Sequence, residues 1–272
     1  MKCEICNFDN PKGSATALII KEGKLLLLKR KEEPFLGQWD LPGGYMDQKE
    51  TPEQSILREL KEELGVNAKV DFIGWFPGKA FWKSEEFPVL NHAFLAEVEG
   101  DIKLNTNENE EYSWQDIKNI SPEEIAFDSN QDIIKYLQRN LIDFFDLKAI
   151  IKQLDSSAKI NEVNFYRSLL NGYLSKKIVD GKLVGAGWIY ARQTLLRKQA
   201  VLEDIIVDGK YRGKGYGEEI TSDLIRWAKE NGVEVIELTT NPSRTAANGL
   251  YQKLGFKLHP TNHYLYNIHP VK

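Results

Sequence analysis

Three glutamates, Glu59, Glu62 and Glu63, lie close together in the sequence at spacings that suit a shared task. Residues three or four apart lie on one face of an α-helix, so a helix here would carry the three carboxylates side by side. Like charges on one face repel one another, and a divalent cation removes that penalty. Because Mg²⁺ prefers hard oxygen ligands and also binds substrate phosphates, the pattern predicts a site for Mg²⁺ or Mn²⁺. Such a site would assemble the metal-assisted attack of water on phosphorus.

The residues around these glutamates predict the helix that positions them, over 51–64. Thr51 can cap its N-terminus, and Pro52 suits its first position. Gln54 completes a capping box with Thr51. The apolar residues expected on the core side of this helix are Leu57, Leu60 and Leu64.

Two more features favour a site over a plain acidic surface. Arg58 can restrain the carboxylates, and the paired glycines Gly43 and Gly44 let the backbone approach a metal or a phosphate closely. The alternative is a solvated acidic helix face, which is the usual fate of charge runs. That alternative would also have to explain why Gly44, Glu50, Arg58 and Gly65 stand at fixed offsets.

The fixed offsets extend over a whole motif. Its residues are Gly44, Glu50, Arg58-Glu59-Leu60, Glu62-Glu63 and Gly65-Val66. Together they resemble the box of the Nudix hydrolase family, and the resemblance covers roughly residues 14–140. It implies an α/β/α sandwich with a mixed sheet. It also implies Mg²⁺-dependent hydrolysis of a nucleoside diphosphate derivative, in which the diphosphate is linked to another group.

The Nudix resemblance also implies roles for individual residues. Glu59, Glu62 and Glu63 would bind the metal and act in catalysis with Arg58. The carbonyl of Gly43 or Gly44 would lie nearby, and Gly44 is our choice as a ligand.

A further acid downstream of the motif often helps as ligand or base in this family. Glu108, Glu110 and Glu111 precede Trp114, where such an acid is expected, and we favour Glu108. The alternative is that each of them is an exposed loop acid. The aromatic residues that could stack on a base, if they are not simply core or rim, are Trp39, Trp75, Phe76, Phe81, Trp82 and Phe127.

A glycine-rich turn between Tyr211 and Gly217 forms a second candidate site. It follows an apolar segment, 202–207, that reads as a strand, and it precedes a predicted helix. A helix N-terminus offers free backbone N–H groups and a positive dipole end, which suit a pyrophosphate. Arg212 and Lys214 add positive charge. The turn alone is a weak signal, and its spacing fits neither a Walker loop nor a Rossmann turn.

The downstream sequence strengthens this reading. Ala247, Leu250-Tyr251 and Gly255-Phe256 follow the next predicted strand, and with Arg212-x-x-Gly215-x-Gly217 they resemble the GNAT acyltransferase family. The resemblance covers roughly residues 146–270 and implies a mixed sheet flanked by helices, with acetyl-CoA as cosubstrate.

The GNAT resemblance implies a general acid, a general base and a cofactor loop. Tyr251 is the candidate acid that protonates the leaving thiolate, or else a packed tyrosine. Glu203 is the candidate base for an acceptor amine, acting directly or through water, or else a structural or substrate-binding group. The acceptor amine is unknown. The residues expected to bind acetyl-CoA are Ile206, Val207, Arg212, Gly213, Lys214, Gly215, Tyr216, Gly217 and Asn248.

The chain of 272 residues is therefore expected to hold two domains, at 14–145 and 146–272, behind a short segment at 1–13. Cys3 and Cys6 form half of a zinc ribbon, and without a second pair we do not expect zinc there. The net charge of −4 gives no reason to expect bulk nucleic-acid binding. The sequence shows no membrane span and no signal peptide, which predicts the cytoplasm.

The remaining elements follow from apolar patterning and turn residues. The expected strands are 15–20, 24–28, 70–76, 89–98, 174–179, 183–190, 201–207, 233–239, 256–258 and 264–268, with a short element starting at 114–117. The expected helices besides 51–64 are 131–145, 146–154, 163–170, 217–231 and 243–254.

Three hypotheses for function follow. The first is a bifunctional enzyme, a pyrophosphohydrolase joined to an N-acetyltransferase. The second is a hydrolase whose other half only binds or senses coenzyme A. The third is a regulatory or scaffold protein with both sites idle, and the intact set of mutually repelling carboxylates argues against it. The oligomeric state is not readable from the sequence.

Overall fold

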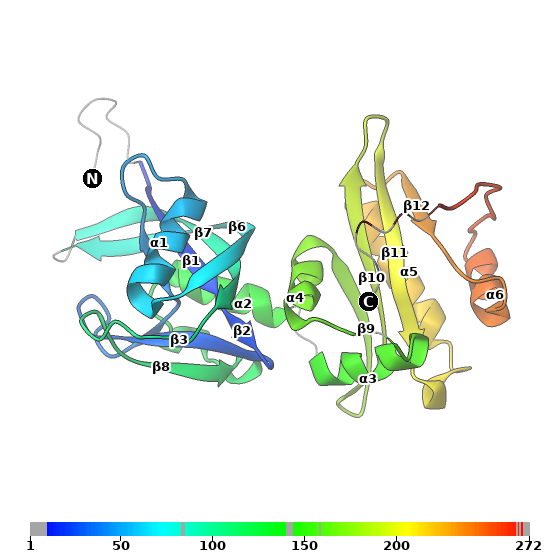
Figure 1. The fold of residues 1–272 in the computed structure, drawn as a ribbon. Helices are drawn as coiled ribbons and strands as arrows, with labels where there is room; N and C mark the ends of the chain where they lie inside the picture. Colours follow the sequence, from blue (N-terminus) through cyan, green and yellow to red (C-terminus); the bar gives the residue numbers. More distant parts are fainter. Residues whose placement is uncertain are drawn as a thin grey trace. The chain divides into compact units, whose positions relative to one another are not determined.

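A computed structural model describes residues 10–82, 85–139, 144–157, 159–264, 266 and 268, with the backbone alone at Trp82 and Leu170. Cys3 and Cys6 lie outside the described residues. The chain divides into two compact units, 1–174 and 175–272 (Figure 1). The predicted domain boundary near 145 stays a prediction. Among the described helices, none combines the length and the apolar character needed to cross a bilayer.

The first unit contains two sheets. One has the strand order β5-β1-β7-β6 and is mixed, because β1 runs parallel to β7 while the other pairs are antiparallel. Its strands are β1 (Lys12–Leu18), β5 (Gly43–Tyr45), β6 (Asn67–Trp82) and β7 (Glu85–Glu99). The other sheet is antiparallel and joins β2 (Ile20–Lys21), β3 (Lys24–Arg30), β4 (Trp39–Asp40) and β8 (Asn109–Asp116).

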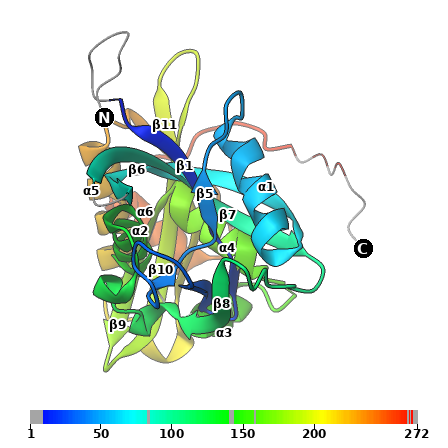
Figure 2. The same cartoon turned by 90° about the vertical axis from the view of Figure 1, so that its left-hand side faces the viewer.

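Helix α1 (Pro52–Leu64) confirms the predicted capping box and ends at Gly65 in the left-handed conformation, with φ of 66°. Figure 2 shows the helix beside β5, which it contacts. Ile56, Leu60 and Leu64 are fully buried. Each such side chain contributes about 1.5–3 kcal/mol when removed from water. Leu57, which was expected in the core, is only half-buried, and the adjacent Ile56 takes its place. The residues of β1, β3 and β7 that meet this helix face are Ala15, Ala17, Leu26, Leu28, Phe94 and Ala96.

The rest of the first unit is largely helical. The predicted helix at 131–145 is wrong in its bounds, since α2 is Asp128–Arg139 and a separate helix, α3, covers Phe144–Leu154. Helix α4 (Glu162–Asn171) begins at the cap Asn161. The carboxylate of Glu162 accepts hydrogen bonds of 2.6 Å from the N–H groups of Glu22 and Gly23, in the turn between β2 and β3. The 3-10 turns between β8 and α2 are η1 (Ile117–Asn119) and η2 (Pro122–Glu124).

The second unit is built on one sheet with the order β12-β11-β10-β9. Strands β10 and β11 are antiparallel, and β11 and β12 are parallel. Gly185 and Gly187 of β10 let a helix, α5, lie directly on the sheet: a Cβ at either would come within 3.0 Å of Ile220. The bounds are β9 (Tyr173–Val179), β10 (Lys182–Gln193), β11 (Lys198–Val207), η3 (Gly209–Tyr211), α5 (Tyr216–Glu230), β12 (Val235–Leu238) and α6 (Thr245–Lys253).

The two strands predicted after α6 are wrong. Residues 256–264, 266 and 268 form no strand in the structure. Leu258, Tyr264, Tyr266 and Ile268 are each more than four-fifths exposed. Apolar alternation predicts a strand only if a partner edge is at hand, and these residues pack against none. Both halves are nevertheless mixed α/β, as predicted.

Candidate functional site

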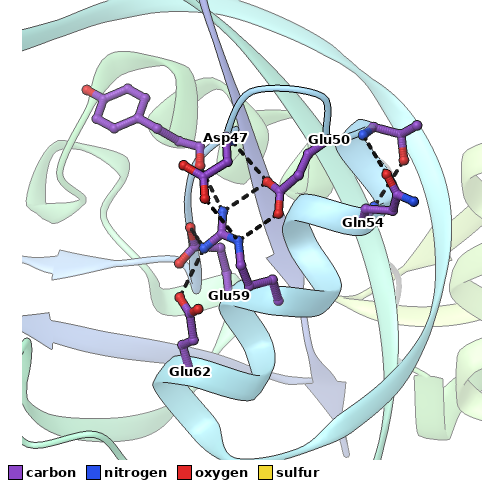
Figure 3. Close-up of polar contacts among 8 residues, drawn as sticks. Asp47, Glu50, Gln54, Glu59 and Glu62 are labelled. Carbon is purple, nitrogen blue, oxygen red and sulfur yellow. Dashed lines mark hydrogen bonds and ion pairs between the residues drawn. The ribbon is translucent and has the colours of Figure 1, made fainter.

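Arg58 is the centre of the charged cluster on α1. Its Nε donates to Glu50 Oε1 at 2.8 Å, and its Nη1 donates to Glu59 Oε1 at 2.8 Å and to Glu62 Oε2 at 3.0 Å. Figure 3 shows Asp47, Glu50, Glu59 and Glu62 converging around these contacts. The hydrogen bond to Arg58 lowers the pKa of Glu50 to about 2. One guanidinium therefore holds three carboxylates in fixed positions, as predicted from its place in the motif.

Glu63 has a different environment from its neighbours. Its side chain is buried, with Oε2 accepting from the N–H of Gly43 at 2.9 Å and Oε1 accepting from Asn109 Nδ2 at 3.2 Å. Burial raises the pKa of Glu63 to about 8, and the nearby charges of Glu59 and Asp40 act in the same direction. Burial also raises the pKa of Glu59, although Arg58 opposes the shift. A nearby cation would offset both penalties, since an opposite charge favours the ionised form.

The glycines of β5 bring backbone against these carboxylates. Gly43 and Gly44 pair with Thr16 and Ala15 of β1, which fixes β5 beside α1. A Cβ at Gly44 would lie 2.5 Å from Glu59 Oε1. Only glycine leaves room here for a carboxylate, and hence for whatever that carboxylate binds. Asn109 could not be predicted from the sequence, because nothing in its local pattern shows that β8 reaches Glu63.

The three downstream acids separate in the structure. Glu110 and Glu111 each form an ion pair of 3.2 Å with Lys29. Glu108 lies in an exposed turn, and its charge acts on Glu59 to raise the pKa of that carboxyl. Of the three acids, Glu108 is thus the one whose charge acts on Glu59, and its role as a ligand or base stays a prediction.

The donor set fits a hard divalent cation. The candidate metal ligands on α1 are all carboxylate oxygens, which Mg²⁺ prefers. Gly44 has no side chain, and a Cβ there would fill the space beside Glu59. Within the described part of the chain, no three His, Cys, Asp or Glu side chains are grouped closely enough to hold a metal. The contacts give the reason: Arg58 lies between Glu59 and Glu62, and Glu63 is turned toward Gly43 and Asn109.

An aromatic cluster lies near the same carboxylates. Phe35 packs edge-on against Phe81 and Phe127, with ring centroids 5.8 and 5.0 Å apart. The guanidinium of Arg30 lies 5.0 Å from the Phe127 ring and bonds Asp40 at 3.1 Å. The charge of Asp40 in turn helps to raise the pKa of Glu63, so the aromatic cluster is connected to the acidic site.

The other aromatic candidates are not part of this cluster. Trp75 packs on Phe72, and Phe76 packs on Tyr136. Trp39 of β4 is paired with Lys29 of β3. The side chain of Trp82 lies outside what the structure describes.

The glycine-rich turn of the second unit is shaped by two glycines with positive φ. Gly213 has φ of 74° and Gly215 has φ of 83°, and Gly215 is the N-cap of α5. A Cβ at either position would meet nothing within 4 Å, so the loop is open on that side. Arg212 donates from Nε to the carbonyl of Val207 at 3.0 Å, and Lys214 lies 5.0 Å from the Tyr211 ring. The loop is thus an open helix N-terminus bordered by cations.

The strand before this loop separates from its neighbour. The last pair between β11 and β12 is Leu202 with Leu238, so Glu203 is the first residue of β11 beyond that pairing. From Glu203 to Val207, β11 has no pairing with β12, which leaves a gap in the sheet on that side. Burial raises the pKa of Glu203, the charge of Asp204 adds to the effect, and His263 opposes it. Ile206 is buried and Val207 is half-buried on the same stretch.

Helix α6 carries the two remaining candidates. Tyr251 packs on Phe256 with centroids 5.9 Å apart, and burial raises its pKa while Arg244 opposes the shift. Asn248 donates from Nδ2 to the carbonyls of Asn241 at 3.1 Å and Arg244 at 3.0 Å. Asn248 therefore holds the turn that leads into α6. Because these bonds use its side-chain nitrogen, the predicted contact with the cofactor would use its side-chain oxygen.

Comparison with known proteins finds two families along this chain. The NUDIX domain family matches residues 11–137, and the acetyltransferase (GNAT) family matches residues 149–256. An ADP-ribose pyrophosphatase of Methanocaldococcus jannaschii is 31% identical over 130 residues, covering 47% of this chain and 75% of that protein. The chain belongs to the Nudix family and also carries a GNAT acetyltransferase domain.

Other relatives of this Nudix–GNAT chain match shorter stretches. An uncharacterized N-acetyltransferase of Bacillus subtilis is 40% identical over 63 residues, which cover 23% of this chain and 26% of that protein. Among solved structures, a MutT Nudix hydrolase from Burkholderia pseudomallei has 26% identity and a TM-score of 0.38, covering 41% of this chain and 88% of that one. A Trypanosoma brucei acetyltransferase has 20% identity and a TM-score of 0.40, covering 46% and 93%. The matches to the two family models, at 11–137 and 149–256, confirm both predicted families.

Proposed function

We propose that the chain is bifunctional: it hydrolyses a nucleoside diphosphate derivative with Mg²⁺, and it transfers an acetyl group from acetyl-CoA to an amine. The observation that carries the hydrolase half is the set of contacts in which Arg58 bonds Glu50, Glu59 and Glu62. A fixed cluster of this kind offers oxygen ligands in defined positions before any substrate arrives.

The hydrolase residues have distinct parts in the proposal. Glu59, Glu62 and Glu63 would hold Mg²⁺ or Mn²⁺, with the carbonyl of Gly44 and the carboxylate of Glu108 as further ligands. The bound ion would neutralise phosphate charge and make a bound water more acidic. Arg58 keeps the carboxylates apart from one another and oriented. Glu50, with its pKa near 2, stays ionised and keeps Arg58 in place.

A nucleoside-containing substrate is supported by the aromatic cluster. The cluster offers the ring surfaces of Phe35, Phe81 and Phe127. Arg30 contacts the Phe127 ring and bonds Asp40, whose charge acts on Glu63. Base rings stack on such surfaces. The M. jannaschii relative, named an ADP-ribose pyrophosphatase, makes ADP-ribose the first compound to test.

The acetyltransferase half rests on the loop at 211–217 and on the gap beside β11. Backbone N–H groups at the start of α5 would bind the pyrophosphate of acetyl-CoA, and Arg212 and Lys214 would add charge. Ile206 and Val207 would bind the pantetheine arm through their backbone. Glu203 would take a proton from the acceptor amine, and Tyr251 would give one to the leaving thiolate.

The test of this proposal uses the whole chain in two assays. The first screens nucleoside diphosphate derivatives, with Mg²⁺ or with EDTA, and measures phosphate-containing products. The second measures release of free coenzyme A with a panel of amines. Hydrolysis that persists without a divalent ion contradicts the metal assignment. Coenzyme A binding without transfer to any amine leaves a hydrolase whose second half only senses coenzyme A.

A further inference from the structure

One face of the second sheet carries a pair of aromatic rings that the proposed chemistry does not use. Gly185 and Gly187 of β10 face α5, because a Cβ at either would touch Ile220. Side chains alternate along a strand, so Trp188 and Tyr190 point to the opposite face. Their rings are stacked, with centroids 4.9 Å apart and an interplanar angle of 25°, and both side chains are half-buried.

The aromatic pair lies next to Glu203. Trp188 is directly opposite Glu203 in the antiparallel pairing of β10 with β11, and Tyr190 is opposite Val201. Opposed residues of an antiparallel pair share one face, with Cβ atoms about 5 Å apart. The carboxylate of Glu203 and the ring of Trp188 are therefore neighbours on one surface, at the point where β11 separates from β12.

The charges around this surface favour a cation. Glu237 of β12 also lies on this face, since it pairs with Val201, but it forms an ion pair of 3.6 Å with Arg192. Within the part of the chain that the structure describes, Glu203 forms no ion pair, and the charges that act on it are those of Asp204 and His263. Asp204 is itself an acid, so the surface attracts a positive group beside the rings.

We propose that Trp188 and Tyr190 bind the body of the acceptor, and that the acceptor is a primary amine on an aromatic or apolar body. This proposal rests on the proposed acetyl transfer. The ammonium would lie at Glu203, where aromatic faces and a carboxylate both attract a cation. The apolar body would cover the two stacked rings, since Trp188 lies directly opposite Glu203.

The transfer balances on these groups. The ammonium loses one proton through Glu203 to solvent, and the free amine attacks the thioester carbonyl carbon. A C–N bond forms and the C–S bond breaks. The amine nitrogen loses a second proton, and Tyr251 supplies one to the thiolate and is reprotonated. The products are an N-acetyl amide, free coenzyme A and one proton.

The experiment compares 2-phenylethylamine with ethanolamine, which keeps the ammonium and lacks the ring. We expect kcat/KM for 2-phenylethylamine to exceed that for ethanolamine by about tenfold or more, from apolar burial on the rings. Trp188→Ala should remove that preference by raising KM for 2-phenylethylamine, while Trp188→Phe restores much of it. Leu195→Ala, at a fully exposed position in the turn between β10 and β11, should change neither value.

The outcomes separate this proposal from the one it rests on. Transfer with equal or better use of ethanolamine, or a Trp188→Ala variant that keeps the preference, overturns the aromatic subsite and leaves acetyl transfer standing. If no amine is acetylated, the proposed acetyl transfer fails. Calorimetry of 2-phenylethylamine binding in the presence of coenzyme A then tests the aromatic subsite by itself. Binding to the wild type that Trp188→Ala abolishes supports the subsite, and equal or absent binding overturns it.

Discussion

The two sites of this chain are built in opposite ways. The proposed hydrolase site is made of charged side chains that hold one another, with Arg58 bonding three carboxylates and Glu63 buried against Gly43. The proposed phosphate loop of the acetyltransferase half is made mainly of backbone, at a helix N-terminus shaped by Gly213 and Gly215. Small side-chain changes should therefore damage the first site, while changes of backbone conformation should damage the second.

The largest expected effect is from Glu62→Gln. The substitution removes one charge from the cluster and keeps the shape of the side chain. We expect hydrolysis to fall about a thousandfold, since a bound metal ion is worth several kcal/mol in the transition state. Acetyl transfer should be unchanged. Glu53→Gln, on the exposed first turn of α1, is the matched control and should retain full hydrolysis. Unchanged turnover in Glu62→Gln would refute the role of this residue.

The glycines of β5 offer a sharper comparison within the first site. In Gly44→Ala, the new Cβ meets the far end of Glu59, which can move, so we expect a folded protein with hydrolysis reduced by about a hundredfold. In Gly43→Ala, the Cβ would lie 2.1 Å from the backbone oxygen of Ala15 at a φ of 144°. That variant should lose stability as well, by about 1–3 kcal/mol or more. Thermal unfolding distinguishes the two variants. Equal melting temperatures for Gly44→Ala and Gly43→Ala would contradict the predicted difference in stability.

The backbone dependence of the second site is tested by Gly215→Val. A β-branched residue at φ of 83° is strained by about 1–2 kcal/mol or more, so the loop should change conformation. We expect coenzyme A affinity to fall by at least about tenfold, with hydrolysis retained. Calorimetry measures the affinity, and a normal Kd would rule out the assigned phosphate loop.

An effect on catalysis without loss of coenzyme A affinity is expected from Tyr251→Phe. The ring still packs on Phe256, so the fold and coenzyme A binding should survive. Loss of the hydroxyl removes the proposed acid, and kcat for acetyl transfer should fall by about a hundredfold. Coenzyme A release with a reactive amine measures kcat, and calorimetry measures binding. A variant with full kcat would assign Tyr251 to packing alone.

Much of the hydrolase site could be predicted because its information is local. The capping box, the helix and the spacing of the glutamates all lie within 51–64. The burial of Glu63 could not be predicted, because its partners Gly43 and Asn109 are 20 and 46 residues away. The short strands β4 and β5 were missed for a related reason. They are two and three residues long, in a segment whose Pro and Gly residues indicate a turn.

The second unit shows the same limit of local information. Its glycine-rich turn and the helices around it follow from turn residues and apolar spacing, and they appear as predicted. The alternating residues Tyr264, Tyr266 and Ile268 predicted a strand, and none of these three described residues lies in one. The aromatic pair Trp188 and Tyr190 read only as part of a strand, because its position beside Glu203 depends on pairing between β10 and β11.

The central claim is that a divalent ion binds the acidic face of α1. Titration of the whole chain with Mn²⁺, followed by the electron paramagnetic resonance signal of the free ion, tests it most directly. The account predicts that the wild type removes about one ion per chain from solution and that Glu62→Gln removes far less. Equal binding by both proteins, or no binding by the wild type, would contradict it.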